Sequence, residues 1–182
     1  MTRKRTFQEL QAQQAPVAAA AQRRRPIAVL LDDIRSLHNV GAIFRTADGA
    51  CLEHLHLCGI TGVPPRDEIR KTSLGAEEVV PWSYHPHPEE VVARLRQRGY
   101  QIVALEQTTA SVDYRTASYR FPLCLIVGHE YNGMRESLVS LADLSIEIPM
   151  CGVKWSLNVS VAFGIAAYEM CSHWAEGVME RG

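Results

Sequence analysis

The sequence predicts an α/β fold in which a mostly parallel sheet is flanked by helices. Short apolar runs alternate along the 182 residues with amphipathic stretches of helical period, which is typical of strand–helix–strand units. Several runs are apolar at every position, as strands are when helices cover both faces of the sheet. The composition, 47% hydrophobic and 21% charged, is that of a folded domain and excludes wholesale disorder.

The first half of the chain contains apolar runs that end at turn-forming residues. Asn39 follows a polar loop and is a plausible helix N-cap, because its side chain can accept a hydrogen bond from the first turn. Pro88 suits the start of a helix and Gly99 its end. The expected elements are a strand at 27–31, a helix at 40–47, a strand at 53–58, a long loop at 59–71, a strand at 78–82 and a helix at 88–99.

The second half continues the alternation of strands and helices. The expected elements are strands at 101–106, 122–127 and 144–148, and helices at 134–141 and 157–174, the last with Ser156 as its N-cap. Ligands of such sheets bind beyond the carboxyl ends of the strands. The segments in which chemistry is expected therefore follow Leu31, Leu105, Val127 and Ile148.

Charge is unevenly distributed along the chain. Residues 1–25 carry six Lys or Arg and one Glu, a balance of +5, which leaves −6 for residues 26–182 because the net charge is −1. We therefore expect a basic, flexible N-terminal extension at 1–25 and one folded domain at 26–182. A basic arm on an acidic body favours a polyanionic partner, although a merely solvated extension has the same composition.

The cysteine count and the hydropathy favour a cytoplasmic protein without a metal. Five Cys with no CxxC pair indicate reduced, buried thiols rather than disulfides. No apolar run approaches the roughly 18 residues of a membrane span, and the N-terminus lacks an apolar signal-peptide block. The pairs His54/His56 and His85/His87 could each share a strand face, but no nearby Cys or carboxylate completes a zinc site.

Three segments near strand ends have an unusual composition. Residues 38–47, HNVGAIFRTA, place Gly41 inside a helix, which indicates a close backbone approach. Residues 128–133, GHEYNG, form a glycine-bracketed turn, but the Met and Arg that follow exclude a P-loop, which needs Lys and then Ser or Thr. Residues 148–162, IPMCGVKWSLNVSVA, run from a strand into the last helix. The sequence also lacks GxGxxG, which disfavours a Rossmann dinucleotide site.

These segments resemble, in content and order, the three motifs of the SpoU (TrmH) RNA 2′-O-ribose methyltransferases of the SPOUT superfamily, over residues 27–169. The resemblance implies an α/β SPOUT fold whose C-terminal part is threaded into a deep trefoil knot. It also implies a homodimer with the site completed across the interface, S-adenosylmethionine as cofactor, and methyl transfer to a ribose 2′-hydroxyl of RNA. His129, Tyr131 and Asn132 depart from the small residues that the family often has in this turn.

The family's site residues can be carried over by motif position. Because arginine holds its proton tightly, we expect Arg45 to be an electrostatic clamp on the 2′-oxygen and a neighbouring phosphate rather than a general base. Asn39 would orient Arg45 or the RNA, and Glu130 would pair with Arg45 or fix the motif loop. Ser156 and Asn158 would position ribose and phosphate at the helix N-terminus. The expected cofactor-binding residues are Leu105, Gly128, Ile148, Ser156 and Leu157.

An RNA substrate requires basic surface, and single-stranded or loop RNA suits an enzyme that must reach a ribose. We expect tRNA rather than rRNA, because only residues 1–25 precede the first strand, where family members often carry an extra RNA-binding domain. Two alternatives stay open: a non-catalytic RNA-binding protein of the same fold, and an enzyme that methylates rRNA or a base nitrogen. The candidate RNA-binding residues are Arg23, Arg24, Arg25, Arg35, Arg66, Arg70 and Lys71.

Overall fold

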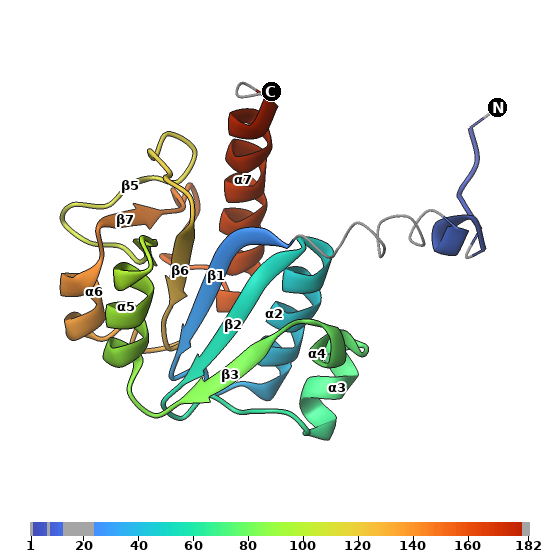
Figure 1. Ribbon diagram of the computed structural model, residues 1–182, viewed down its shortest axis with the longest axis horizontal. Helices are drawn as coiled ribbons and strands as arrows, with labels where there is room; N and C mark the ends of the chain where they lie inside the picture. The colour runs from blue at the N-terminus through green and yellow to red at the C-terminus, as the bar shows by residue number, and fades with distance from the viewer. Residues whose placement is uncertain (1, 7, 13–23, 180–182) are drawn as a thin grey trace.

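The computed structural model describes residues 2–6, 8–12 and 24–179, and its strands form a seven-stranded, all-parallel sheet. The strand order is β3-β2-β1-β6-β4-β7-β5 (Figure 1). The predicted α/β class with a parallel sheet is therefore confirmed. The strands are β1 (Arg25–Asp32), β2 (Leu52–Cys58), β3 (Trp82–His85), β4 (Gln101–Leu105), β5 (Val112–Asp113), β6 (Leu123–Val127) and β7 (Leu144–Glu147).

Helices cover both faces of the sheet. Because side chains alternate along a strand, Ile27, Val29 and Leu31 of β1 point to one face, and Ala28 and Leu30 point to the other; all are buried. The first face packs on α2 and α7 and the second on α5 and α6 (Figure 1). The helices of residues 24–179 are α2 (Leu37–Gly49), α3 (Asp67–Ser73), α4 (Ala76–Val79), α5 (Pro88–Gln97), α6 (Glu136–Leu141) and α7 (Val159–Met179). Of the helices in the described chain, none has the length and apolarity that a membrane crossing requires.

The stretch expected to be a loop at 59–71 contains the start of α3, at Asp67, so that expectation is wrong for its last residues. This helix lies so close to α2 that a Cβ at Gly41 would be 2.4 Å from the carbonyl oxygen of Ile69. The close backbone approach expected at Gly41 is therefore confirmed. Only a residue without a side chain lets the two helices meet at this distance.

The strand expected at 78–82 is also wrong. α4 occupies 76–79 instead, and the buried Ala76 and Val80 are four residues apart, which is a helical spacing. β3 begins only at Trp82 and pairs with β2 alone, as an edge strand. The two-residue β5 is too short to produce an apolar run and has no counterpart in the sequence prediction.

Both helix N-caps expected from the sequence are wrong. Ser36 caps α2, and its Oγ accepts a hydrogen bond from the backbone nitrogen of Asn39 at 3.3 Å. Asn158, not Ser156, precedes α7, and its Oδ1 accepts from the backbone nitrogen of Ser160 at 2.9 Å. Asn158 therefore has a local structural role as the cap of α7, which was not predicted from the sequence.

Candidate functional site

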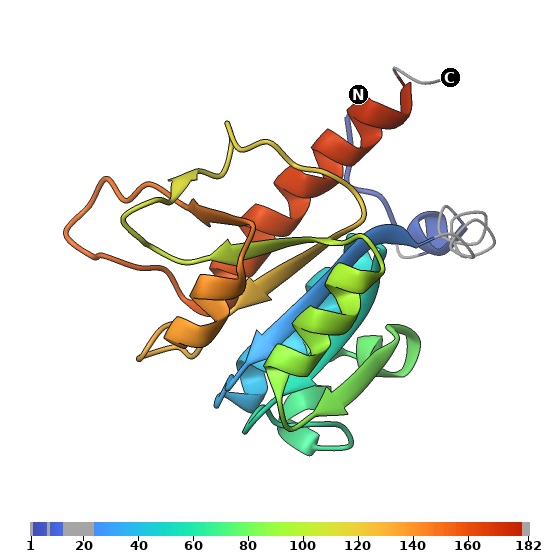
Figure 2. The same ribbon diagram turned by 60° about the vertical axis from the view of Figure 1, so that its left-hand side comes forward.

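A cavity of about 350 Å³ opens where β4, β6 and β7 reach their carboxyl ends. The segments that follow β4 and β7 project together from this side of the sheet, away from β3 (Figure 2). Glu106, Glu130 and Glu147 line the cavity, and none of its lining residues is Lys or Arg. Its walls therefore favour a ligand that carries positive charge. All the expected cofactor-binding residues line it, from separate stretches of the chain: Leu105, Gly128, Ile148, Ser156 and Leu157.

Polar contacts hold the turn at 128–134, which forms one wall of the cavity. A Cβ at Gly128 would lie 2.5 Å from the backbone nitrogen of Met134, so the turn closes only with glycine at this position. The same nitrogen donates to the Glu106 carboxylate at 2.8 Å. Nδ1 of His129 accepts from the backbone nitrogens two and three residues later, at 3.0 and 3.1 Å. The unusual His129 thus shapes the turn.

Glu130 joins this turn to the segment that leads into α2. Its carboxylate accepts from the backbone nitrogens of Arg35 at 3.1 Å and Ser36 at 2.9 Å, and from Nδ2 of Asn39 at 3.0 Å. Oδ1 of Asn39 in turn accepts from Nδ2 of Asn158 at 3.1 Å. Burial raises the pKa of the Glu130 carboxyl, but the hydrogen bonds that it accepts lower its pKa by more, to below the usual value. The three motifs are therefore joined by one chain of hydrogen bonds.

Arg45 does not line the cavity. It is exposed on α2, and its side chain makes no hydrogen bond or ion pair with the described part of the chain. Two roles were expected for Glu130: to pair with Arg45 or to fix the motif loop. Within a single chain the Glu130 carboxylate binds Arg35, Ser36 and Asn39, which fixes the loop, and it does not contact Arg45. The loop at 148–158 exposes Val153 and Trp155 by 91% and 84%, and Trp155 also lines the cavity.

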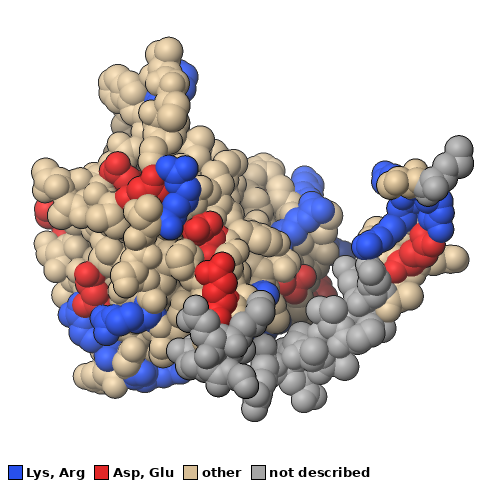
Figure 3. All heavy atoms as spheres, turned by 90° about the horizontal axis from the view of Figure 1, so that it is seen from above, with Lys and Arg blue, Asp and Glu red and all other residues tan. Residues whose placement is uncertain are grey.

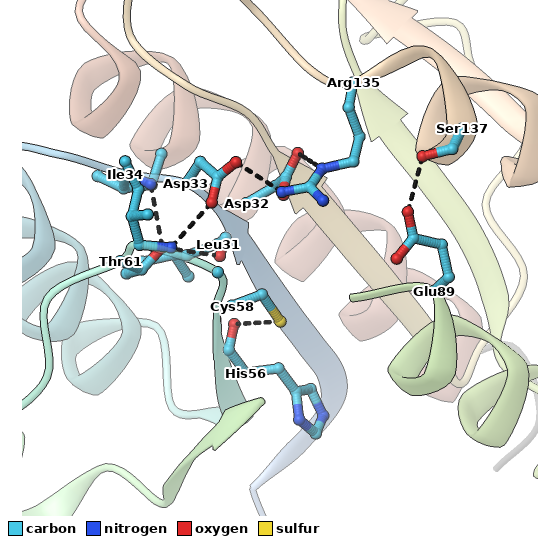
Figure 4. Close-up of polar contacts among 12 residues, drawn as sticks. Leu31, Asp32, Asp33, Ile34, His56, Cys58, Thr61, Glu89, Arg135 and Ser137 are labelled. Atoms are coloured by element: carbon cyan, nitrogen blue, oxygen red, sulfur yellow. Dashed lines mark hydrogen bonds and ion pairs between the residues drawn. The ribbon is translucent and has the colours of Figure 1, made fainter. Parts of the chain in front are cut away.

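A cluster of Asp32, Asp33 and Arg135 fastens the other end of the turn (Figure 4). Nε of Arg135 donates to Asp32 at 3.0 Å, and its Nη2 lies 2.6 Å from a carboxylate oxygen of each aspartate. Asp32, at the end of β1, is 1% exposed. This cluster was not predicted from the sequence; its signal was a pair of acids directly after an apolar strand, with an arginine two residues after the glycine-bracketed turn.

Two of the candidate RNA-binding arginines are anchored in the structure. Arg24 donates to the carbonyl oxygens of Leu52 and Val79 at 3.1 and 2.7 Å, and Arg25 donates to that of Ala50. Arg25 is also the first residue of β1, so the extension expected at 1–25 ends before it. These two side chains are committed to backbone oxygens and hold the start of the domain in place.

The remaining described candidates are exposed, and their side chains make no hydrogen bond or ion pair within the described residues. They are Arg35, Arg66, Arg70 and Lys71. Arg23 lies outside the described residues. On the face shown in Figure 3, Lys and Arg form small groups separated by Asp and Glu. That face therefore offers separate cationic points rather than one continuous basic patch.

Three of the four histidines in the two pairs, His54, His56 and His85, form a hydrogen-bonded cluster with Ser83. His54 and His56 share a face of β2, and Oγ of Ser83 lies 2.8 Å from Nε2 of His54 and 3.3 Å from Nδ1 of His56. Nε2 of His85 is 2.8 Å from the same oxygen, and Arg94 donates to its Nδ1 at 3.1 Å. Burial lowers the pKa of His56 to about 3 and also lowers those of the other two histidines. Within the part of the chain that the structure describes, no group of His, Cys, Asp or Glu is arranged to hold a metal.

Known proteins resemble this chain over most of its length. Residues 26–168 match the SpoU rRNA Methylase family. The tRNA (guanosine(18)-2′-O)-methyltransferase of Escherichia coli K12 is 34% identical over 152 residues, which cover 82% of this chain and 64% of that protein. The chain thus spans slightly less than two thirds of this relative.

Solved structures share the fold as well. The TrmH/SpoU tRNA modifying enzyme of A. aeolicus superimposes with a TM-score of 0.81 at 31% identity, over 93% of this chain and 86% of that chain. The AdoMet-bound rRNA methyltransferase of Sinorhizobium meliloti superimposes with a TM-score of 0.76 at 34% identity, over 81% of this chain and 56% of that chain.

Proposed function

The chain belongs to the SpoU rRNA methylase family, and on that premise we propose that it transfers a methyl group from S-adenosylmethionine to a ribose 2′-hydroxyl of RNA, with tRNA favoured over rRNA. One observation carries the proposal. The turn at 128–133 and the loop at 148–158 line one cavity, and hydrogen bonds join the segment of Asn39 to both. The name of the Escherichia coli relative makes guanosine in tRNA the first target to test.

The cavity fits S-adenosylmethionine in size and in charge. Its volume of about 350 Å³ falls in the range of small-molecule pockets, about 300–1,000 Å³. When bound, the cofactor supplies an electrophilic methyl group on a positively charged sulfonium. Glu106, Glu130 and Glu147 give the walls the opposite charge. Backbone groups at the ends of β4 and β6 suit an adenine that is recognised by main-chain hydrogen bonds.

The side chains of the motifs would align the ribose and remove its proton. Alignment of two reactants can contribute about 7–11 kcal/mol. Arg45 would stabilise the negative charge that develops on the 2′-oxygen while the proton passes to a neighbouring phosphate. Glu130, Asn39 and Asn158 would keep the turn and the start of α7 in register, with Ser156 beside the ribose.

We propose that a second copy of the chain completes the site. Arg45 does not line the cavity of a single chain, and apolar side chains of the loop at 148–158 and of α7 are exposed. Besides the loop at 148–158, α7 exposes Val161 by 50% and Tyr168 by 54%. A homodimer interface over these residues would bury them and bring further side chains to the cavity mouth.

Two finer features follow from the family and belong to the same proposal. The C-terminal part of the chain would form the deep trefoil knot, for which the return of the loop at 148–158 to Asn39 gives support. A cytoplasmic location would match an RNA substrate, and the five cysteines, which form no disulfide, are compatible with it.

Methyl transfer from radiolabelled S-adenosylmethionine to tRNA transcripts tests the function directly. The expected product carries one 2′-O-methyl group, which blocks alkaline cleavage at that nucleotide and is located by mass analysis of nuclease digests. Incorporation that leaves every linkage alkali-labile would indicate methylation of a base nitrogen. Calorimetry that detects no binding of S-adenosylmethionine would favour a non-catalytic RNA-binding protein.

A further inference from the structure

A second hollow, of about 320 Å³, lies at the β3 edge of the sheet, and it shares no lining residue with the cavity described above. Its walls combine an indole ring, two prolines, two guanidinium groups and three carboxylates, which belong to Trp82, Pro64, Pro65, Arg66, Arg70, Asp67, Glu77 and Glu78. The proposed methyl transfer leaves this combination without a role.

Trp82 supplies a flat, rigid wall. It is half-buried, and its ring meets the fully buried Phe44 edge to face, with centroids 6.5 Å apart and planes at 89°. Pairing with Leu55 of β2 fixes its backbone. The core therefore holds the indole in one orientation while part of it stays accessible, as in the aromatic platforms on which nucleic-acid bases stack.

All charged side chains of the hollow except Glu77 are free of partners within the described residues. The side chains of Arg66 and Arg70 are exposed and form no ion pair or hydrogen bond within the described residues, although both share the hollow with carboxylates. Glu78 is likewise exposed and unpaired, whereas its neighbour Glu77 accepts a hydrogen bond from Ser73. Asp67 is exposed and unpaired within the described residues as well, so the hollow offers two cations and two carboxylate acceptors to a ligand.

The start of the domain lies beside this hollow. Arg24 donates to the carbonyl oxygen of Val79, the residue after Glu78, at 2.7 Å. The chain therefore enters β1 next to the hollow, and the basic sequence at 1–25 is joined to the domain at this edge. A polyanion bound at the hollow would be close to the junction with that sequence.

We propose that this hollow binds one unstacked nucleobase of an RNA, which stacks on Trp82, places its flanking phosphates against Arg66 and Arg70, and donates from its amino group to Glu78. The inference rests on the proposed function, since it takes RNA as the ligand. A phosphate inside the hollow would be repelled by Glu78, whereas a neutral base would not be. A carboxylate only accepts hydrogen bonds, so adenine, cytosine and guanine can each donate from an exocyclic amino group, whereas uracil has only its ring N3–H to donate and should bind more weakly.

The test measures fluorescence anisotropy of labelled hexanucleotides of adenosine and of uridine with the full chain. Trp82→Leu should weaken binding of the adenosine oligomer about tenfold, because stacking on one aromatic side chain contributes about 1–3 kcal/mol. Trp82→Phe should retain most of the affinity. Trp174→Leu is the matched control, because it removes an indole of α7 that packs on Phe121. This variant should bind the oligomer as the parent chain does.

Two surface substitutions keep the test informative if Trp82→Leu impairs folding. Arg70→Ala should weaken RNA binding, and the slope of the logarithm of the binding constant against the logarithm of salt concentration should fall by the equivalent of about one phosphate contact. Arg120→Ala, at another exposed arginine that is unpaired within the described chain, should change neither quantity. Glu78→Gln should reduce the preference for the adenosine over the uridine oligomer. Equal binding by the parent chain, Trp82→Phe, Arg70→Ala and Glu78→Gln would overturn the inference.

Methyl transfer measured in parallel separates this inference from the proposed function. If no RNA is methylated but binding depends on Trp82 and Glu78, the base site stands and the reaction does not. If tRNA is methylated with an unchanged KM by Arg70→Ala and Glu78→Gln, the reaction stands and the base site does not. Affinity that depends on Arg70 but not on Trp82 or Glu78 would mean a phosphate contact only, and would also overturn the base site.

Discussion

Asn158 donates through Nδ2 to Oδ1 of Asn39, 119 residues earlier in the chain, at 3.1 Å. The Oδ1 of Asn158 is occupied as well, by the backbone nitrogen of Ser160. One amide group therefore caps α7 and ties it to α2, and the same Asn39 continues the connection to Glu130.

Replacement of Asn158 should show both functions of this amide. Asn158→Ala should lower the free energy of unfolding by about 1–2 kcal/mol, since loss of a cap alone costs about 1 kcal/mol. Asn158→Asp keeps an oxygen for the Ser160 nitrogen and loses the donor to Asn39, so its stability should be intermediate. Urea denaturation measures both, and an Asn158→Ala chain as stable as the parent would refute the capping role.

Arg45 should act on turnover and not on cofactor affinity. Arg45→Ala should reduce methyl transfer by about 10²–10³-fold, the usual loss when a group that stabilises a developing oxyanion is removed. Binding of S-adenosylmethionine, followed by calorimetry, should stay within about twofold because Arg45 does not line the cavity. A parallel loss of both would show that the residue supports the fold instead. Arg45→Lys, which keeps the charge without the planar fork, should retain part of the rate.

Glu130 should control the cavity wall. Glu130→Ala removes the acceptor of three hydrogen bonds and should weaken cofactor binding about tenfold or more, because the turn at 128–134 loses its connection to α2. Glu130→Gln keeps one acceptor oxygen and should lose less. The dissociation constant of S-adenosylmethionine provides the comparison, and equal constants for the parent and both variants would contradict this role.

The Asp32–Arg135 pair should behave as a coupled unit. Arg135→Ala leaves Asp32 with a buried charge and should cost about 3 kcal/mol of stability. Asp32→Asn in the Arg135→Ala background should restore part of that loss, because an amide tolerates burial better than a carboxylate. A double-mutant cycle in urea measures the coupling. Strictly additive losses would mean that the two side chains act independently.

Acidification below neutral pH should destabilise the fold through the histidine cluster. The pKa of His56 is about 3 in the folded chain against an ordinary value of 6.5. Between these two pH values the imidazole is therefore protonated in the unfolded chain and neutral in the folded chain. Stability from this group is present above pH 6.5 and is lost as the pH falls towards 3. The free energy of unfolding should therefore decrease from pH 7 to pH 5, and His56→Gln should flatten this slope. His87→Gln, at an exposed histidine, is the control and should leave the slope unchanged.

The sequence sufficed for most strands because their signal is local. The runs that became β1, β4 and β6 are apolar at nearly every position and could be placed within one or two residues. The segment at 76–85 misled the prediction because the apolar pair before Pro81 is compatible with a strand and with a helix end. Only packing against the core decides between the two.

The candidate site could likewise be predicted from the sequence only in part. Motif position identified the cavity residues, since backbone groups at Leu105, Gly128 and Ile148 are fixed by the strands that precede them. It could not show that Glu130 and Asn158 are joined through Asn39, or that Arg135 holds two aspartates. Such contacts join residues far apart in the chain, and nothing in their own neighbourhood specifies the partner.

The position of β1 inside the sheet has a consequence for how the molecule is made. β1 pairs with β6, so Ile27 lies opposite Leu123, and that partner is synthesised long after β1 has left the ribosome. Until then one edge of an apolar strand stays open, which invites association between nascent chains. Contacts of such long sequence separation also slow refolding. Yield during expression should therefore depend on chaperones and on low temperature more than the stability of the finished domain suggests.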